Sequence, residues 1–167
     1  MMKNVIVLAL IFIGTIHAES MHAAYKIEYG IFGKMGVSDA CLTRENGRYR
    51  IKMVAKATGL AKILSGGRVE IYESEGVVFN GHLLPKVFRK EIKRSGKKRV
   101  KSYRFDHGYR RITYHEKKYR DGKLESESNG TLPYYADNDI LSLYFNTPTI
   151  IGDCTKPFDG FLKAVGA

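Results

Sequence analysis

The chain has 167 residues and a formal net charge of +11, with two cysteines and no tryptophan. Hydrophobic residues make up 44% of the sequence and only four residues are proline, which excludes a disordered chain and a collagen-like chain. Two cysteines are too few for a small fold held together by disulfides, whereas a chain of about 150 residues buries enough surface to fold alone. The sequence therefore predicts one folded domain without a metal ion or a cofactor.

The first 18 residues have the pattern of a secretory signal peptide. One positive charge at Lys3 precedes an apolar run over residues 5–13, Gly14 breaks the run, and Ala18 fits a cleavage site. The run is much shorter than the ~20 apolar residues that cross a bilayer, so cleavage is favoured over a retained membrane anchor. We expect a periplasmic mature protein over residues 19–167, with a cut after Ala24 as the alternative start.

Export would place Cys41 and Cys154 in an oxidising compartment, where disulfides form. Two thiols alone do not make a zinc site, so one disulfide between these two cysteines is favoured. Closing so long a loop would stabilise the fold by about 4 to 5 kcal/mol in the chain-entropy model. Two separate buried thiols that pack as small hydrophobic groups are the alternative.

From Ala24 onward, apolar and polar residues alternate in short runs that end at glycine or asparagine, as in an antiparallel all-β domain. Asn46-Gly47 predicts a tight hairpin turn, and the turns together predict roughly nine strands. Further turn signals fall at residues 66–67, 80–81, 95–96, 107–108 and 121–122.

Two segments have a helical pattern instead. A short one over residues 58–64 begins at Thr58 and ends at two glycines, and a longer one over residues 137–145, with Asp137 or Asn138 as its cap, is expected to stop at Pro148. The apolar face of the longer helix needs a sheet to pack against. We therefore expect a mainly β fold: a curved antiparallel sheet, or half-barrel, with one or two short helices docked on it. That apolar face consists of Ile140, Leu141, Tyr144 and Phe145.

The C-terminal residues have the start of a further helix. Pro157 can open it, yet the chain stops at Ala167. A piece of a longer protein and a short docked tail are the two interpretations that this pattern leaves open. The apolar stripe of this helix consists of Phe158, Phe161, Leu162 and Val165.

The basic residues concentrate in the middle of the chain. Residues 86–120 hold 15 lysines and arginines against three acidic residues, so this segment alone carries the positive charge of the protein. Aromatic residues alternate with these cations, and in an exported protein such a face attracts anionic lipids or acidic polymers rather than nucleic acid. A solvated outer face that keeps edge strands from pairing is the alternative. The candidate anion-binding residues are Arg89, Lys93, Arg99, Lys101, Arg104, Arg110 and Arg111.

No pattern in the sequence predicts a catalytic or metal site. None of the five histidines has a metal-ligand spacing to another histidine, a cysteine or a carboxylate. His107 and His115 each adjoin an acidic residue, but neighbours on a strand point to opposite faces and so do not form an acid–base pair. We expect a protein that is not an enzyme and uses no cofactor. An envelope hydrolase with one of these histidines beside a carboxylate of another strand is the alternative.

Six short motifs follow one another along the chain: Tyr25-Lys26-Ile27-Glu28-Tyr29-Gly30, Thr58-Gly59-Leu60, Tyr72-Glu73-Ser74-Glu75-Gly76, Leu84-Pro85, Tyr103-Arg104-Phe105-Asp106 and Asp139-Ile140-Leu141-Ser142-Leu143-Tyr144-Phe145. In this order and spacing they resemble the DUF3108 family of bacterial exported proteins of unknown function. The resemblance implies an envelope protein of Gram-negative bacteria with an antiparallel half-barrel, similar to lipoprotein-carrier folds that hold acyl chains on a concave apolar face. The family has no accepted catalytic residues to carry over, and residues 86–120 are more basic here than the resemblance implies.

The leading hypothesis is a non-catalytic periplasmic binding or carrier module for an apolar ligand or an anionic lipid. The alternative is an envelope scaffold that binds a protein or a polyanion through the basic strands, and a membrane surface is a further candidate partner. The apolar residues that would line a ligand site could instead fill the core. These candidate ligand-binding residues are Tyr25, Ile27, Tyr29, Tyr49, Ile51, Met53, Ile140, Leu141 and Tyr144.

Overall fold

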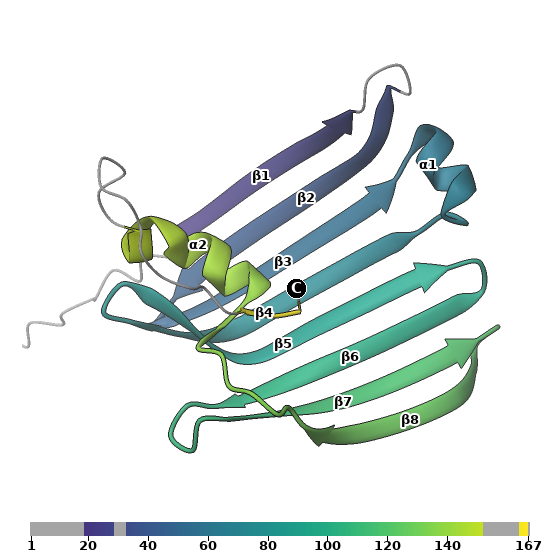
Figure 1. Ribbon diagram of the computed structural model, residues 1–167. Coiled ribbons are helices and arrows are strands. Elements are labelled where there is room, and N and C mark those ends of the chain that lie inside the picture. The colour runs from purple at the N-terminus through teal and green to yellow at the C-terminus, as the bar shows by residue number, and fades with distance from the viewer. Residues whose placement is uncertain (1–18, 29–32, 152–163, 167) are drawn as a thin grey trace, which may run out of the picture.

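Eight strands form one antiparallel sheet in which each strand pairs with its neighbours in the sequence (Figure 1). The computed structural model describes residues 19–28, 33–151 and 164–166, the side chains of residues 148–151 excepted. The strands of the sheet are β1 (Glu19–Glu28), β2 (Lys34–Glu45), β3 (Arg48–Ala57), β4 (Val69–Phe79), β5 (His82–Arg94), β6 (Lys97–Asp106), β7 (Arg111–Arg120) and β8 (Lys123–Thr131). The remaining elements are helix α1 (Gly59–Leu64), helix α2 (Ile140–Ile151) and a parallel pair of two-residue strands, β9 (Asn138–Asp139) and β10 (Ala164–Val165).

The sheet is curved, and α2 lies across one of its faces, which we call the concave face; the opposite one is the convex face (Figure 1). Within the described residues the sheet stays open, because β1 and β8 each pair with one strand only. The predicted fold class, a mainly β protein with a curved antiparallel sheet and two short helices, is confirmed. The predicted number of strands differs, because the sheet has eight and the two further strands, β9 and β10, pair only with each other.

Short hairpin turns set the strand boundaries. At Asn46-Gly47, Asn80-Gly81 and Asp121-Gly122 both residues have positive φ, the conformation of the two-residue turns that match the twist of a hairpin. These predicted turns are confirmed.

The prediction that Pro148 ends the second helix is wrong, since α2 continues to Ile151. A proline removes one backbone donor from a helix, and here it lies in the last turn. Helix α1 occupies almost the whole of the predicted segment, but none of its residues is buried. Within the described residues no helix is both long and apolar enough to span a membrane.

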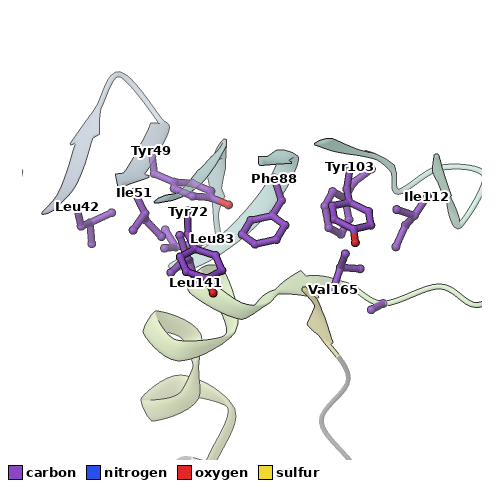
Figure 2. Packing of buried hydrophobic residues seen from close by; sticks show 12 residues of the cluster. Leu42, Tyr49, Ile51, Tyr72, Leu83, Phe88, Tyr103, Ile112, Leu141 and Val165 are labelled. Atoms are coloured by element: carbon purple, nitrogen blue, oxygen red, sulfur yellow. The ribbon is translucent and has the colours of Figure 1, made fainter. Parts of the chain in front are cut away.

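The core lies between the concave face and the segments that cover it. Residues of six strands, β2 to β7, contribute to it, and Figure 2 shows Leu141 and Val165 meeting them from the other side. Phe88, at the centre, is fully buried, and a Cβ atom on Gly166 would lie 2.4 Å from its ring. The buried apolar residues are Leu42, Tyr49, Ile51, Tyr72, Leu83, Phe88, Tyr103, Phe105, Ile112, Ala136, Leu141 and Val165.

A buried carboxylate fixes the start of α2 on the sheet. Asp139 Oδ1 accepts hydrogen bonds from the backbone N–H groups of Leu141 and Ser142 at 2.8 and 2.9 Å, so Asp139, rather than Asp137 or Asn138, caps the helix. Its Oδ2 accepts a hydrogen bond from the Ser74 hydroxyl of β4 at 2.6 Å, and the Tyr49 hydroxyl lies 2.9 Å from that of Ser74. One carboxylate therefore caps a helix and ties it to the middle of the sheet.

A second polar anchor lies two turns further along α2. The side-chain amide of Asn146 accepts a hydrogen bond from the Leu83 N–H at 2.8 Å and donates one to the Leu83 carbonyl oxygen at 2.9 Å. The amide therefore replaces a neighbouring strand at a part of β5 that reaches beyond β6. Buried backbone groups need such partners, so this contact sets the position of the helix as well as holding it.

We expect the stability difference between the wild-type protein and Asp139→Asn to depend on pH. Burial raises the pKa of the Asp139 carboxyl group above its ordinary value of 3.8, and its hydrogen bonds offset this only in part. The folded state then binds the proton more tightly than the unfolded state, so the group stabilises the fold most below pH 3.8 and less as pH rises toward the raised pKa. The free energy of unfolding should thus shift in favour of Asp139→Asn as pH rises from about 4 to about 7.

Urea unfolding followed by circular dichroism at each pH measures this difference. A difference that stays constant, or that moves in favour of the wild type with rising pH, would contradict the assignment.

Candidate functional site

On the concave face a row of aromatic rings crosses four strands, and three of them, Tyr72, Phe88 and Tyr103, belong to the buried core. The rings of Tyr72 and Phe88 stack with their centres 6.3 Å apart, and those of Phe88 and Tyr103 with theirs 5.9 Å apart. Tyr114 on β7 is paired in register with Tyr103. Cross-strand pairs of this kind stabilise a sheet. Here the rings also contact the residues that follow on the concave face of β5 and β6.

Two lysines come next on the same face, directly opposite each other. Lys90 on β5 pairs in register with Lys101 on β6. The Lys90 Nζ lies 5.3 Å from the centre of the Tyr72 ring and 3.4 Å from the carbonyl oxygen of Gly166. The Lys101 Nζ lies 5.2 Å from the ring centre of Tyr103 and 4.5 Å from that of Tyr114. Neither ammonium group forms an ion pair with a carboxylate of the described residues, although both side chains are half-buried.

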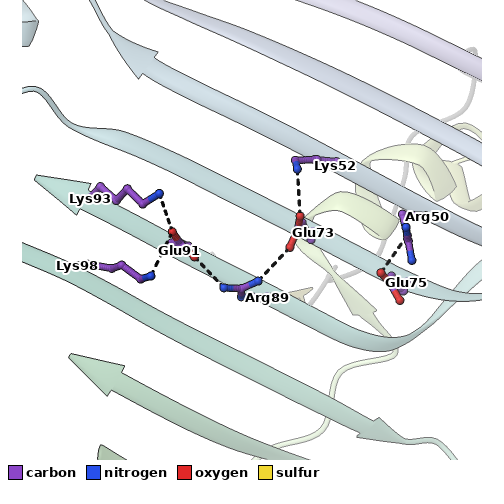
Figure 3. A network of polar contacts seen from close by, with 8 residues as sticks. All are labelled: Arg50, Lys52, Glu73, Glu75, Arg89, Glu91, Lys93 and Lys98. Atoms are coloured by element: carbon purple, nitrogen blue, oxygen red, sulfur yellow. Dashed lines mark hydrogen bonds and ion pairs between the residues drawn. The ribbon is translucent and has the colours of Figure 1, made fainter. Parts of the chain in front are cut away.

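On the convex face a similar pair of lysines has a carboxylate partner. Lys93 and Lys98 are also opposite each other on β5 and β6, but Glu91 lies between them, with Oε1 3.0 Å from the Lys93 Nζ and 4.0 Å from the Lys98 Nζ (Figure 3). Arg89 donates to the other oxygen of Glu91 at 2.8 Å. Burial alone would raise the pKa of Glu91, yet the hydrogen bond from Lys93 and the charges of Lys98 and Arg89 hold it below 4.5. Glu91 is therefore ionised at neutral pH and neutralises its lysines.

The acid paired in register with Lys101 already has other partners. Glu116 on β7 pairs in register with Lys101, but its oxygens interact with Arg99 and, at 3.9 Å, with Lys118. Burial would raise the pKa of Glu116, and the hydrogen bond and charge of Arg99, with smaller effects of Lys118 and Lys101, lower it instead. This part of the concave face therefore keeps an excess of positive charge.

The predicted anion-binding residues do not share one face. In register, Arg89, Lys93, Arg104 and Arg111 point to the convex face, whereas Arg99 and Lys101 point to the concave face. Arg110 lies in the turn after β6 with its guanidinium 4.6 Å from the centre of the Tyr135 ring. The interpretation of the basic segment as a single face is therefore corrected, because alternate residues of a strand point in opposite directions.

The predicted ligand-binding residues divide into three groups. Tyr49, Ile51 and Leu141 are buried in the core, where they contact neighbouring side chains. Met53 and Ile140 are half-buried against that core. The third group is exposed on the concave side and consists of Tyr25, Ile27 and Tyr144. The ninth predicted residue, Tyr29, lies outside the described residues.

The convex face has two adjoining depressions, of about 900 and 510 Å³. Both are lined by Lys86, the extra residue of a β-bulge opposite Glu75 and Gly76, and by Val87. Arg48 lines the larger depression and Arg104 the smaller one. Both depressions are open; the lining of the larger one is mainly polar, whereas that of the smaller one is mainly apolar.

The histidines and cysteines do not converge on a reactive centre. The His107 Nε2 lies 2.7 Å from the carbonyl oxygen of Pro85, so Nε2 donates there and Nδ1 accepts from the Tyr135 hydroxyl at 2.6 Å. Among the described residues no three metal-ligating side chains come together. The Cys41 side chain is half-buried on the convex face, and Cys154 lies outside the described residues, so the disulfide remains a prediction.

A comparison with protein-family models matches residues 24–149 to DUF3108, a family of proteins of unknown function. This chain belongs to the DUF3108 family. The family match covers the whole of the sheet from β2 to β8 and most of α2, and so includes both the aromatic row and the two concave lysines. Searches of curated proteins and of solved structures give no match.

Sequence reasoning missed Lys90 and the tyrosines beneath it as parts of one site. Lys90 stands among fifteen cations of the segment, and nothing local separates it from Lys93. The signal that could have found it is the strand period counted from a buried residue, because Phe88 and Lys90 must point to the same face.

We expect salt to change the stability of two double variants in opposite directions. Lys90→Gln with Lys101→Gln removes a repulsion that salt screens, so the wild type should gain stability relative to this variant as salt rises. Lys93→Gln with Lys98→Gln removes an attraction to Glu91, so the wild type should lose stability relative to it. Each change should amount to roughly 0.2–1 kcal/mol between about 0.05 and 0.5 M NaCl.

Both variants lose two positive charges, so a general effect of net charge would move them together. Urea unfolding at the two salt concentrations separates the cases, and the same sign for both variants would contradict the assigned pairing.

Proposed function

We propose that this protein is a non-catalytic binding module of the bacterial envelope whose concave face holds an anionic lipid. The observation that carries the proposal is that one face presents exposed apolar side chains together with lysines that lack a carboxylate partner among the described residues. An acyl lipid with an acidic head group needs both kinds of surface. The signal-peptide pattern supports a periplasmic location for the mature chain.

The apolar part of the proposed surface lies at the β1 edge of the sheet. Tyr25 and Ile27 point to the concave face and are 44% and 56% exposed, and Tyr144 of α2 is 61% exposed with its hydroxyl 3.1 Å from that of Tyr25. In register with Tyr25, β2 and β3 present only the small residues Ser38 and Ala55. Large apolar side chains thus lie beside a part of the concave face that carries only small side chains, an arrangement suited to an acyl chain.

Helix α1 gives a second reason to expect contact with lipid. It stands at the end of the sheet opposite the β4–β5 hairpin (Figure 1), and its Ile63 and Leu64 are 77% and 76% exposed. Lys62 lies between Leu60 and these two residues in the last turn. Exposed apolar side chains beside a cation are typical of segments that contact an anionic membrane surface.

We expect the mature protein, purified from the periplasm without detergent, to carry one acidic lipid per chain. Ile27→Glu places a carboxylate among the apolar side chains and should reduce the lipid-bound fraction at least about fivefold. Lys26→Glu, on the opposite face of the same strand, is the control, and it changes the net charge more. Native mass spectrometry followed by lipid extraction measures the bound fraction. An empty wild-type protein, or equal loss in the two variants, would contradict the proposal.

We expect Ile63→Ser to weaken binding to vesicles that contain phosphatidylglycerol by about 3- to 10-fold, because an exposed apolar side chain no longer enters the lipid. Phe79→Ser is the matched control, since Phe79 is 61% exposed in the hairpin at the other end of the sheet. Vesicle flotation measures both. Equal binding by the wild type and Ile63→Ser would remove α1 from the membrane contact.

A second candidate function is an envelope scaffold that binds a polyanion on the convex face. The two depressions that share Lys86 favour it, because Arg48, Lys86 and Arg104 line them without an ion-pair partner among the described carboxylates. Binding to a soluble polyanion such as heparin that is lost in Lys86→Glu, with no lipid in the purified protein, would favour this function over the first.

A further inference from the structure

We infer that Lys90 and Lys101 form a phosphate-binding clamp, so that the head group held on the concave face is a phosphate. The inference rests on the proposed function in that it names the head group of the proposed lipid. Its basis is the arrangement of the two ammonium groups and of the charges around them.

Two like charges directly opposite each other on neighbouring strands destabilise a sheet. Lys90 and Lys101 are such a pair, and their half-burial keeps water from screening the repulsion fully. A single anion that contacts both ammonium groups turns the repulsion into two charge-assisted hydrogen bonds. The empty clamp is therefore an unfavourable state, and a bound anion relieves it.

The tyrosine rings place the two ammonium groups without neutralising them. The three cation–π distances, 5.3 Å for Lys90 and 5.2 and 4.5 Å for Lys101, all lie within the attractive range of about 6 Å. An ammonium group has three donors, and Lys90 uses one on the Gly166 carbonyl oxygen. Donors of both lysines are thus available to a ligand on the concave side.

The charges that surround the clamp also favour an anion. Glu116 forms ion pairs with Arg99 and Lys118. Glu70 on β4 forms an ion pair with Arg68 and accepts a hydrogen bond from the Tyr72 hydroxyl. Among the residues that the structure describes, the remaining charge on this part of the face is positive. A phosphate group has several charged oxygens that can be shared between two ammonium groups, and lysine binds phosphate as a compact point charge.

The convex pair of Lys93 and Lys98 makes a matched control. It occupies the same two strands, but Glu91 already supplies the anion that bridges it. Lys93→Gln with Lys98→Gln therefore removes the same charge from the same strands without touching the clamp.

The test compares the mature wild-type protein, Lys90→Gln with Lys101→Gln, and the convex control. Each is titrated with phosphatidylcholine vesicles that contain phosphatidylglycerol, with the same vesicles carrying oleate in its place, and with free glycerol 3-phosphate followed by phosphorus NMR. Thermal unfolding by circular dichroism verifies that the three proteins are folded.

We expect the wild type to prefer phosphatidylglycerol to oleate, and the concave variant to bind phosphatidylglycerol at least about tenfold more weakly, a loss typical of two charge-assisted contacts. The convex control should stay within about threefold of the wild type, as expected for exposed ion pairs. Equal loss in both variants, undiminished binding by the concave variant, or equal affinity for oleate would overturn the clamp.

The outcomes also separate the clamp from the proposed function. If lipid still co-purifies and is lost in Ile27→Glu but not in the concave variant, the clamp fails and the lipid-binding function stands. If glycerol 3-phosphate binds through the two lysines while vesicles do not bind, the clamp stands for a soluble phosphate ester and the lipid-binding function fails.

Discussion

The Asp139 carboxylate, buried between helix and sheet, is the contact on which the arrangement of the concave face depends. It caps α2 and accepts a hydrogen bond from Ser74, and the Asn146 amide holds the same helix to the backbone of β5. Polar contacts of this kind allow one position only, whereas apolar packing tolerates small shifts. The helix is thereby kept at one position on the concave face, and Lys90 and Lys101 form the next concave pair along β5 and β6 after the buried pair of Phe88 and Tyr103.

The distribution of the few acidic residues then decides which of the many cations are available to a ligand. On the convex face Glu73 and Glu91 connect β3, β4, β5 and β6 in one network of ion pairs (Figure 3). On the concave face Lys90 and Lys101 have no such partner among the described residues. A net charge of +11 therefore says less about binding than the positions at which carboxylates are missing.

Local patterns were enough to predict the fold class, the hairpin turns and the presence of two helices, but not the number of strands or the ends of α2. The period of two and the turn pairs such as Asn46-Gly47 depend on neighbours in the sequence, and they gave the fold class correctly. The site depends on register between strands, which the sequence does not contain. Tyr49 and Ile51, predicted to line a ligand site, belong to the core because other segments pack on them. The predicted basic residues divide between two faces because alternate residues of a strand point in opposite directions. Of the predicted anion-binding residues, Lys101 alone belongs to the proposed clamp.

The central claim is that an anionic lipid lies on the concave face with its acyl chain toward β1 and its head group at Lys90 and Lys101. Nuclear Overhauser contacts between the mature protein and a short-chain phosphatidylglycerol below its micelle concentration test this directly. The account predicts contacts from the acyl protons to the Ile27 methyl groups, and from the glycerol protons to the ε-methylene groups of the two lysines. Contacts to Val87 on the convex face, or contacts to neither face, would contradict it.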